Sequence, residues 1–371
     1  MQIYIATALT DVIIFFTVFF VMYRAGEAGL SNGLCTLLGI SGSIGYVITS
    51  FASGKLVNHK NCRHLLLISS LAGTILCITV FFSTNYLLNL FFLFVFGLAN
   101  GIFFNAFQAF MRNSSSKGDI IKTICMYTVA WSCGTSLGYL FSGSLYKLGP
   151  YALSAIVVLT GACVLWIFRK DSSIEDKSES GNYPLSTNIM FVWMGWVIIF
   201  VVTFVERAIL VFFPVLCAQK NLGPFYASLP LFLMMLGQGV FSIYFFRNKN
   251  LFYKKNIIVI MNILAATTLL LVWVFPSYLV YLAGFTLFGI YGCFAYFSAV
   301  LYANNHFENQ SYNVGINEGI VGISSILGVV ISYFWMKALP GPDSIYLGCA
   351  MLLIILIFIT ALMPVKSREK A

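Results

Sequence analysis

The sequence predicts an all-α membrane protein in which twelve transmembrane helices form two six-helix bundles. Three observations support this fold class: an apolar composition, apolar runs long enough to cross a bilayer, and features of the first half that recur in the second. The 371 residues are 60% hydrophobic and 9% charged, with a mean hydropathy of +0.91. Since a soluble domain carries about 25% charged residues, these charges are too few to cover a water-facing surface. We therefore expect a lipid bilayer to surround the chain.

The predicted spans follow from runs of about 20 apolar residues, the length that crosses a bilayer. The first run begins at Ile3 with no basic stretch before it, so we interpret it as a span and not as a signal peptide. The twelve predicted spans are 3–23, 32–56, 65–82, 86–111, 120–146, 151–168, 189–217, 226–246, 256–274, 278–303, 313–336 and 345–363.

Lysine and arginine residues are distributed unequally between the two sides of these spans. With the N-terminus in the cytoplasm, sixteen fall inside; Arg207 lies within a span, and four lie outside, at Arg24, Lys147, Lys220 and Lys337. This asymmetry places both termini in the cytoplasm. We expect a multi-pass protein of the cell membrane, either a plasma membrane or a bacterial inner membrane. The net charge of +9 then reflects membrane orientation, and no nucleic-acid partner is expected.

One long polar stretch divides the chain. Residues 169–188 are rich in serine and charge, which is typical of a flexible cytoplasmic linker. A regulatory phosphorylation site within it is the alternative interpretation. The predicted domains are an N-terminal six-helix bundle over 1–168 and a C-terminal six-helix bundle over 189–371.

The second half repeats features of the first at a nearly constant offset. Gly45 is followed eighteen residues later by Arg63, and Gly237 eighteen residues later by Lys255, which is an offset of 192. The segments "FGLANGIFF" at Phe96 and "FGIYGCFAYF" are also 192 residues apart. Two similar six-helix halves joined by a cytoplasmic linker are typical of transporters, whose substrate site lies between the halves.

Two partial motifs add a family resemblance over essentially the whole chain. The loop after the second span resembles the G-x-x-x-D-R-x-G-R-R signature of the major facilitator superfamily, matching it at Gly54 and Arg63, with Asn58 in place of the acid. The fifth span resembles the family's G-x-x-x-G-P-x-x-G-G signature at Gly134, Gly138 and Gly143, with Tyr139 in place of the proline. The resemblance implies the major facilitator fold, transport by alternating access, and a gating loop that holds Gly54, Asn58 and Arg63. The full fifth-span motif accompanies proton antiporters and exporters, so its partial form weakly favours export.

Four ionisable residues lie within the predicted spans: Asp11, Glu206, Arg207 and Glu318. One charged residue at a bilayer centre costs roughly 2.5–3.5 kcal/mol on insertion scales, so such groups face a cavity or each other. The repeat places Asp11 opposite Thr203, one turn before Arg207, and the resemblance implies that both helices line the central cavity. We therefore expect Asp11 to pair with Arg207.

Glu206 projects from a different face of the helix than Arg207, and we expect it to point towards the eleventh helix or the interior of its own half. A carboxyl group buried without a fixed cation can bind and release a proton near neutral pH, which favours proton coupling through Asp11 or Glu206. The alternatives are a structural tie between helices for Glu206 and Arg207 and a helix cap for Glu318.

Polar and aromatic residues follow one stripe on each of two helices that the resemblance places at the cavity. The fourth span carries Asn100, Phe104 and Gln108 at spacing four, with Asn105 beside them. The tenth carries Tyr291, Ser298 and Tyr302 at spacings of seven and four. These residues, together with Thr203 of the seventh span, are candidates for substrate contact. Hydrogen bonding between helices is the alternative interpretation.

These features predict a secondary active transporter, a symporter or antiporter, that moves a small solute with protons. The alternative is a transporter-like sensor or assembly protein without transport activity. No P-loop is present, no histidine belongs to a catalytic motif, and Met and Cys form no convergent ladder, so we expect no ATP-driven machine, no enzyme and no copper carrier. A single intramembrane arginine disfavours a polyanion carrier. We expect a monomer without cofactor or metal.

Overall fold

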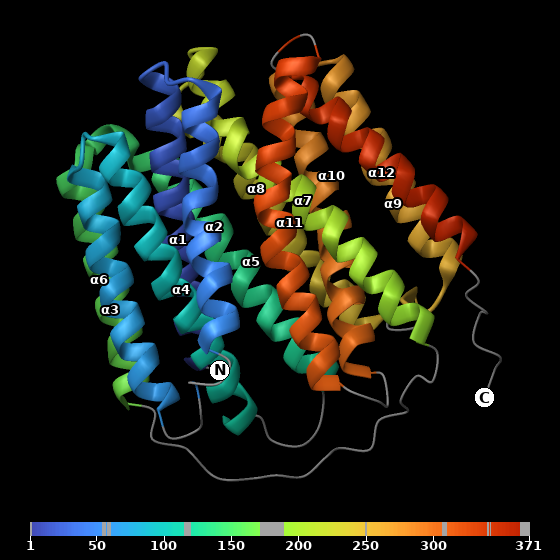
Figure 1. Cartoon of the computed structure of the whole chain (residues 1–371), viewed down its shortest axis with the longest axis horizontal. Coiled ribbons are helices and arrows are strands. Elements are labelled where there is room, and N and C mark those ends of the chain that lie inside the picture. Colours follow the sequence, from blue (N-terminus) through green and yellow to red (C-terminus); the bar gives the residue numbers. More distant parts are fainter. Residues whose placement is uncertain are drawn as a thin grey trace. The chain divides into compact units, whose positions relative to one another are not determined.

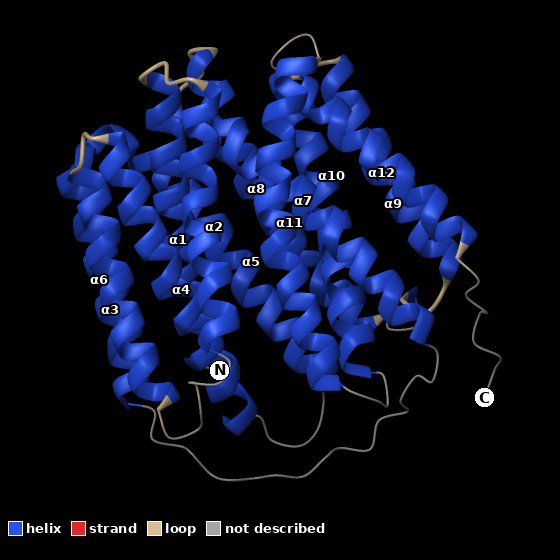
Figure 2. Ribbon diagram, viewed as in Figure 1, coloured by secondary structure: helices blue, strands red, loops and turns tan. Residues whose placement is uncertain are grey.

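The computed structural model describes residues 2–53, 57, 61–114, 120–170, 189–248, 251–305, 310–339, 341 and 343–363. Over these ranges the regular secondary structure is helical, as Figure 2 shows. Gly54 and Asn58 of the predicted gating loop and the whole predicted linker, apart from its first two residues, lie outside the described residues.

Twelve long helices follow one another along the described parts of the chain (Figure 1). In order they are α1 (Gln2–Glu27), α2 (Asn32–Ser53), α3 (Cys62–Phe82), α4 (Tyr86–Ser114), α5 (Ile120–Leu145), α6 (Gly149–Lys170), α7 (Ile189–Gln219), α8 (Pro224–Arg247), α9 (Lys255–Val274), α10 (Tyr278–Asn305), α11 (Gln310–Ala338) and α12 (Ser344–Leu362). The predicted fold class, with twelve spans, is confirmed.

Length and hydropathy alone find eleven candidate spans in the described residues, because Cys125–Arg169 counts as one. That stretch is 45 residues long. As one helix at about 1.5 Å per residue it would be twice as long as a bilayer is thick. A 3-10 turn, η1 (Tyr146–Leu148), and Gly149 at φ 81° break it into α5 and α6. Two spans therefore lie within it.

The internal repeat extends to the helix ends. The last residues of α1 and α7, Glu27 and Gln219, are 192 residues apart, and the same offset joins the first residues of α4 and α10, Tyr86 and Tyr278. The packing repeats as well: α3 lies beside α6, and α9 lies beside α12 (Figure 1). The two halves are therefore built to one plan.

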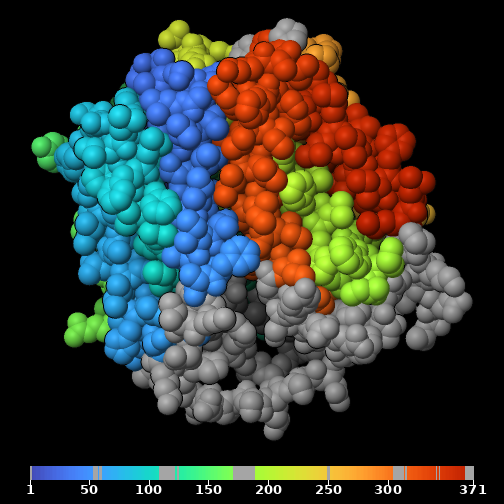
Figure 3. Space-filling view, in the orientation of Figure 1, coloured from blue at the N-terminus to red at the C-terminus, as the bar shows by residue number. Residues whose placement is uncertain are grey.

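The outer surface of the described helices carries large apolar side chains. Ile68, Leu159 and Phe358 expose 64%, 68% and 63% of their surface. Phe334 of α11 and Ile355 of α12, helices that adjoin on the face in Figure 3, expose 58% and 55%. A water-soluble monomer does not expose so much contiguous apolar surface. The chain is a multi-pass membrane protein, and these exposed apolar side chains are suited to contact lipid.

Two compact units divide the chain. Unit 1 comprises 1–118, 130–181 and 210–232, and unit 2 comprises 119–129, 182–209 and 233–371. The units thus follow the two predicted bundles for most of their length but exchange short pieces of α5, α7 and α8. The predicted boundaries at 168 and 189 stay a prediction.

A proline accompanies the point where α7 passes from one unit to the other. The division falls between Ile209 and Leu210, and Pro214 lies within the helix. Proline has no backbone N–H, so the carbonyl of Leu210 lacks its helical donor four residues on. The helix is therefore weakened where the two units share it.

Close backbone contacts between neighbouring helices recur in both units. A Cβ atom added at Gly97 of α4 would lie 1.9 Å from the carbonyl oxygen of Gly42 in α2. One added at Gly289 of α10, 192 residues later, would lie 1.9 Å from the carbonyl oxygen of Met234 in α8. Only glycine fits at this spacing, as in small-residue packing of membrane helices generally.

An arginine caps one helix of unit 1. Arg24 of α1 donates hydrogen bonds to the carbonyl oxygens of Val80, Phe81 and Ser83 at the end of α3, at 3.3, 3.2 and 2.8 Å. Its guanidinium also lies 4.8 Å from the centre of the Phe20 ring. A cation at a helix C-terminus satisfies carbonyls that have no helical partner and interacts favourably with the helix dipole.

Candidate coupling site

The α7 helix places two charged residues in the interior of unit 2. Glu206 exposes 3% of its surface, while Arg207 is half-buried. The residues around them are apolar and buried, from Phe204 and Val205 to Ala208 and Ile209. The helix forms because its backbone groups must bond internally in lipid, and it then places the glutamate among buried apolar side chains.

A short chain of hydrogen bonds surrounds Glu206. The hydroxyl of Tyr296 in α10 lies 3.1 Å from Oγ1 of Thr203 in α7. The same tyrosine hydroxyl bonds to the Glu206 carboxyl group. A carboxylate only accepts hydrogen bonds, so Tyr296 donates to the ionised glutamate and can accept from Thr203. The three polar groups form one network from two helices.

Three charged groups act on the Tyr296 hydroxyl: Glu206, Arg207 and Glu318. Glu318 belongs to α11, is half-buried and is the ninth residue of its helix. Among the described groups that act on Tyr296, two carboxyl groups and one guanidinium would, if all were ionised, sum to one negative charge. A charge without compensation is costly at membrane depth. The arrangement is therefore suited to hold one proton.

Asp11 lies in the other unit. It exposes 1% of its surface within α1. The backbone of α5 approaches α1 closely beside it: Cβ atoms added at Gly134 and Gly138 would lie 2.2 Å from the carbonyl oxygen of Ala8 and 2.9 Å from that of Val12. Two glycines of the predicted fifth-span motif thus serve close packing against the helix that carries Asp11. The predicted pairing of Asp11 with Arg207 would join the two units, and it stays a prediction.

The α4 candidates have different surroundings. Asn100 lines a small cavity inside unit 1, while Phe104 packs edge-on against Tyr46 with ring centres 6.2 Å apart. Asn105 donates from Nδ2 to the carbonyl oxygen of Ser50 in α2 at 3.0 Å. The side chain of Gln108 lies outside the described part of the structure. At Asn105 the hydrogen bond joins two helices, and substrate contact at these positions stays a prediction.

The α10 candidates are all buried. Tyr291 exposes none of its surface and packs against Phe288 at 5.6 Å between ring centres. Ser298 donates to the carbonyl oxygen of Phe294 in its own helix, and the Tyr302 hydroxyl donates to that of Phe252. Their predicted contact with substrate is untested.

Arg63 of the predicted gating loop caps a helix, as does its repeat partner. Arg63 donates to the carbonyl oxygens of Phe168, at 2.9 Å, and Arg169, at the end of α6. Lys255, 192 residues later, donates to the carbonyl oxygen of Met363, at 2.7 Å, just after α12. The shared plan of the two halves therefore includes a cation that ties the start of one helix to the end of another.

Tyr296 is the residue of this site that the sequence interpretation did not include. It lies off the stripe of Tyr291, Ser298 and Tyr302. It is also one of three aromatic residues in the segment "CFAYFSAV", so nothing in the sequence distinguishes it as a site residue. Its hydroxyl was the one available signal, since a hydroxyl in an apolar span needs a hydrogen-bond partner on a facing helix.

Comparisons with known proteins agree with this architecture. The family model described as Major Facilitator Superfamily matches residues 3–303. Comparison with curated proteins gives no match. Among solved structures, a mutant form of the nucleoside transporter NupG superposes with a TM-score of 0.71 at 12% identity, over 97% of this chain and 98% of that one.

Two further solved structures share the fold. A bacterial homolog of the human lysosomal transporter Spinster, inward-facing and occupied, has a TM-score of 0.65 at 13% identity, covering 100% of this chain and 97% of that one. The human organic anion transporter MFSD10 (TETRAN) has a TM-score of 0.65 at 11% identity, covering 97% and 98%. At these identities the similarity establishes the fold alone.

Proposed function

Because this chain belongs to the major facilitator superfamily, we propose that it is a secondary active transporter that moves a small solute by alternating access and couples this movement to protons. The coupling group is the Glu206 carboxyl, with Tyr296 as its hydrogen-bond partner. Asp11 in unit 1 is the second candidate for proton binding. The protein acts as a monomer in a cell membrane with both termini in the cytoplasm.

One observation carries the proton-coupling proposal: the Glu206 carboxyl exposes 3% of its surface in an apolar helix and bonds to the hydroxyl of Tyr296, which also contacts Thr203. A bound proton neutralises the excess negative charge, and its release restores it. A helix bundle that alternately exposes such a group to either side of the membrane moves protons with its solute. The charge imbalance also gives a reason why an apolar helix keeps a glutamate at this depth.

The proposed direction of transport and the proposed class of substrate rest on separate observations. The partial fifth-span glycine motif favours export. One intramembrane arginine among the described residues favours a neutral or cationic solute over a polyanion. The solved structures of similar fold include a nucleoside transporter and an organic anion transporter, so uridine, adenosine and p-aminohippurate are suitable first probes.

The test begins with the melting temperature of the purified protein in the presence of each probe, since a bound solute stabilises the folded state. The solute that raises it most is then supplied to proteoliposomes under an imposed pH gradient. Wild-type protein is expected to accumulate the solute against its gradient. Glu206→Gln is expected to lose the accumulation that depends on pH, although it inserts normally.

Glu27→Gln is the matched control. Glu27 also accepts a hydrogen bond from a tyrosine, Tyr146, at 2.5 Å, but it is exposed at the end of α1. This variant is expected to transport like the wild type. Normal pH-driven accumulation by Glu206→Gln would end the coupling proposal. Binding of a probe without any flux in the wild type would favour a sensor over a transporter.

A further inference from the structure

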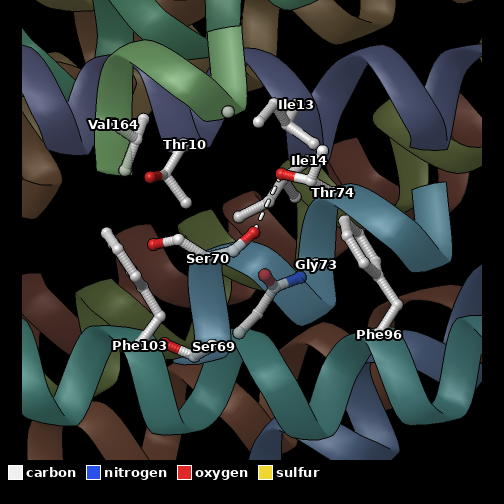
Figure 4. A pocket seen from close by; sticks show the side chains of 12 residues that line it. Thr10, Ile13, Ile14, Ser69, Ser70, Gly73, Thr74, Phe96, Phe103 and Val164 are labelled. Atoms are coloured by element: carbon white, nitrogen blue, oxygen red, sulfur yellow. Dashed lines mark hydrogen bonds between the residues drawn. The ribbon is translucent and has the colours of Figure 1, made fainter. Parts of the chain in front are cut away.

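A small polar cavity lies inside unit 1, among α1, α3, α4 and α6 (Figure 4). It has room for about one water molecule. Five polar side chains line it, and each exposes 8% or less of its surface: Thr10, Ser69, Ser70, Thr74 and Asn100. The remaining lining residues are apolar or glycine.

The hydroxyl groups of this cavity have already used their hydrogens. Thr10 donates to the carbonyl oxygen of Ala6 at 3.0 Å, and Thr74 to that of Ser70 at 2.8 Å. Ser69 and Ser70 donate in the same way to carbonyl oxygens of the preceding turn, each at 2.6 Å. A hydroxyl has one hydrogen and two lone pairs. The four oxygens can therefore only accept from, or coordinate, whatever occupies the cavity.

Two glycines line this space, and at Gly161 a side chain would collide with an oxygen of the cavity. A Cβ atom added at Gly161 of α6 would lie 2.4 Å from Oγ1 of Thr74, so any side chain there would displace this oxygen. At Gly73 the added Cβ would lie 3.9 Å from Oδ1 of Asn100, which faces α3. Figure 4 shows Gly73 between the hydroxyl-bearing turn of α3 and Phe96 of α4.

The repeat supplies an internal comparison. The residues 192 positions after the five polar ones are Val202, Met261, Asn262, Ala266 and Gly292. The positions that follow Gly161 and Val164 by the same offset hold Leu353 and Leu356, both fully buried. Asn262 instead donates to Oγ1 of Thr360 at 3.4 Å. Because the same plan folds in unit 2 with mostly apolar residues at these positions, the fold does not require the hydroxyls of unit 1.

We propose that the cavity binds one monovalent alkali cation, Na⁺ or K⁺, through the oxygen atoms of Thr10, Ser69, Ser70, Thr74 and Asn100. Hard cations prefer oxygen ligands, and neutral protein oxygens that replace a hydration shell are the usual ligands of alkali ions in membrane proteins. None of the lining residues is a carboxylate, which disfavours a divalent ion.

This proposal goes beyond proton coupling and does not depend on it. The cation connects α1, which carries Asp11, to other helices of its unit, so its binding is expected to stabilise unit 1. The probe is the salt itself: the melting temperature of the full-length protein is measured in NaCl, KCl and N-methyl-D-glucamine chloride at equal ionic strength.

A matched pair of variants locates the effect. Thr74→Val replaces one oxygen of the cavity by a methyl group of similar size. Thr79→Val makes the same change on the same helix, at a threonine that also donates to the preceding turn, at 2.9 Å, but does not line the cavity. We expect a higher melting temperature in NaCl or KCl than in the organic salt for the wild type and Thr79→Val, and no such difference for Thr74→Val.

The comparison of NaCl with KCl identifies the ion. If Thr74→Val does not fold, Ser70→Ala takes its place with the same expected loss. Equal melting temperatures of the wild type in all three salts would overturn the proposal and indicate that the cavity holds a water molecule. So would an alkali-ion effect that Thr74→Val or Ser70→Ala retains in full.

Discussion

The Tyr296 hydroxyl lies 3.1 Å from Oγ1 of Thr203, and the same hydroxyl bonds to Glu206 one turn further along α7. Tyr296 thus joins α10 to two polar groups of α7. Removing its oxygen leaves Thr203 and the buried carboxyl without this partner. A hydrogen bond to a charged group contributes about 1.5–3 kcal/mol, so the loss is large enough to change the transport cycle.

We therefore predict that Tyr296→Phe lowers the rate of pH-driven solute transport by about tenfold or more, the equivalent of about 1.4 kcal/mol, while membrane insertion is unchanged. Transport is measured in proteoliposomes at equal protein content. Tyr146→Phe, which removes the hydroxyl from the exposed pair with Glu27, is the control and is expected to transport normally. Equal rates for both variants would exclude Tyr296 from the site.

The predicted pair of Asp11 with Arg207 is tested by a double-mutant cycle. If the two charges neutralise each other, Asp11→Asn and Arg207→Gln each leave one uncompensated charge, and each single variant is less stable than the wild type. The double variant is then expected to be more stable than the sum of the single effects predicts, by about 0.5–3 kcal/mol. Melting temperatures of the four proteins measure this coupling. Additive effects would show that the residues have separate partners.

The close glycine contacts predict that a glycine-to-alanine substitution lowers stability equally in the two halves. Gly97→Ala and Gly289→Ala each force a methyl group against a backbone carbonyl oxygen 1.9 Å away. Each is expected to lower stability by about 1–3 kcal/mol, the usual cost of overpacking. Gly292→Ala on α10 is the control, since its added atom meets only Gln238 at 3.8 Å or more. Thermal unfolding in detergent measures all three, and tolerance of Gly97→Ala and Gly289→Ala would contradict the close packing.

Arg24→Lys tests the cap of α3. A lysine keeps the charge but lacks the planar fork that reaches three carbonyl oxygens. We expect a loss of stability of about 1–2 kcal/mol, roughly one charged hydrogen bond, in the same unfolding measurement. Lys147, exposed beyond the end of α5, supplies a comparison: Lys147→Ala is expected to change stability little. A lysine at position 24 that left the melting temperature unchanged would show that the cap does not contribute.

The helices themselves could be predicted closely from the sequence. The predicted spans that begin at 32, 86, 120, 189 and 278 begin at the same residues in the structure. An apolar run marks the part of the chain that lies in lipid, so composition and length alone locate it. The 192-residue offset, first visible in short segments, also describes the helix ends.

The sequence was less informative about which face of each helix packs against which neighbouring helix. Nearly every position of a buried span is apolar, so the sequence gives little information about which side of α10 meets α7, and Tyr296 was not identified. The α4 candidates have different neighbours: Asn100 faces a cavity beside α3, and Asn105 bonds to α2. Arg24 and Arg63 cap the ends of helices that are distant in sequence and come together only on folding, so the sequence does not reveal these caps.

Proton movement driven by solute alone is the most direct test of the central claim. Proteoliposomes that contain the pH indicator pyranine, without an imposed gradient, receive the solute that stabilises the protein most. The account predicts a change of internal pH with the wild type and Glu27→Gln, and solute movement without any pH change with Glu206→Gln. A wild-type protein that moves solute and no protons, or a Glu206→Gln variant that moves both as the wild type does, would contradict it.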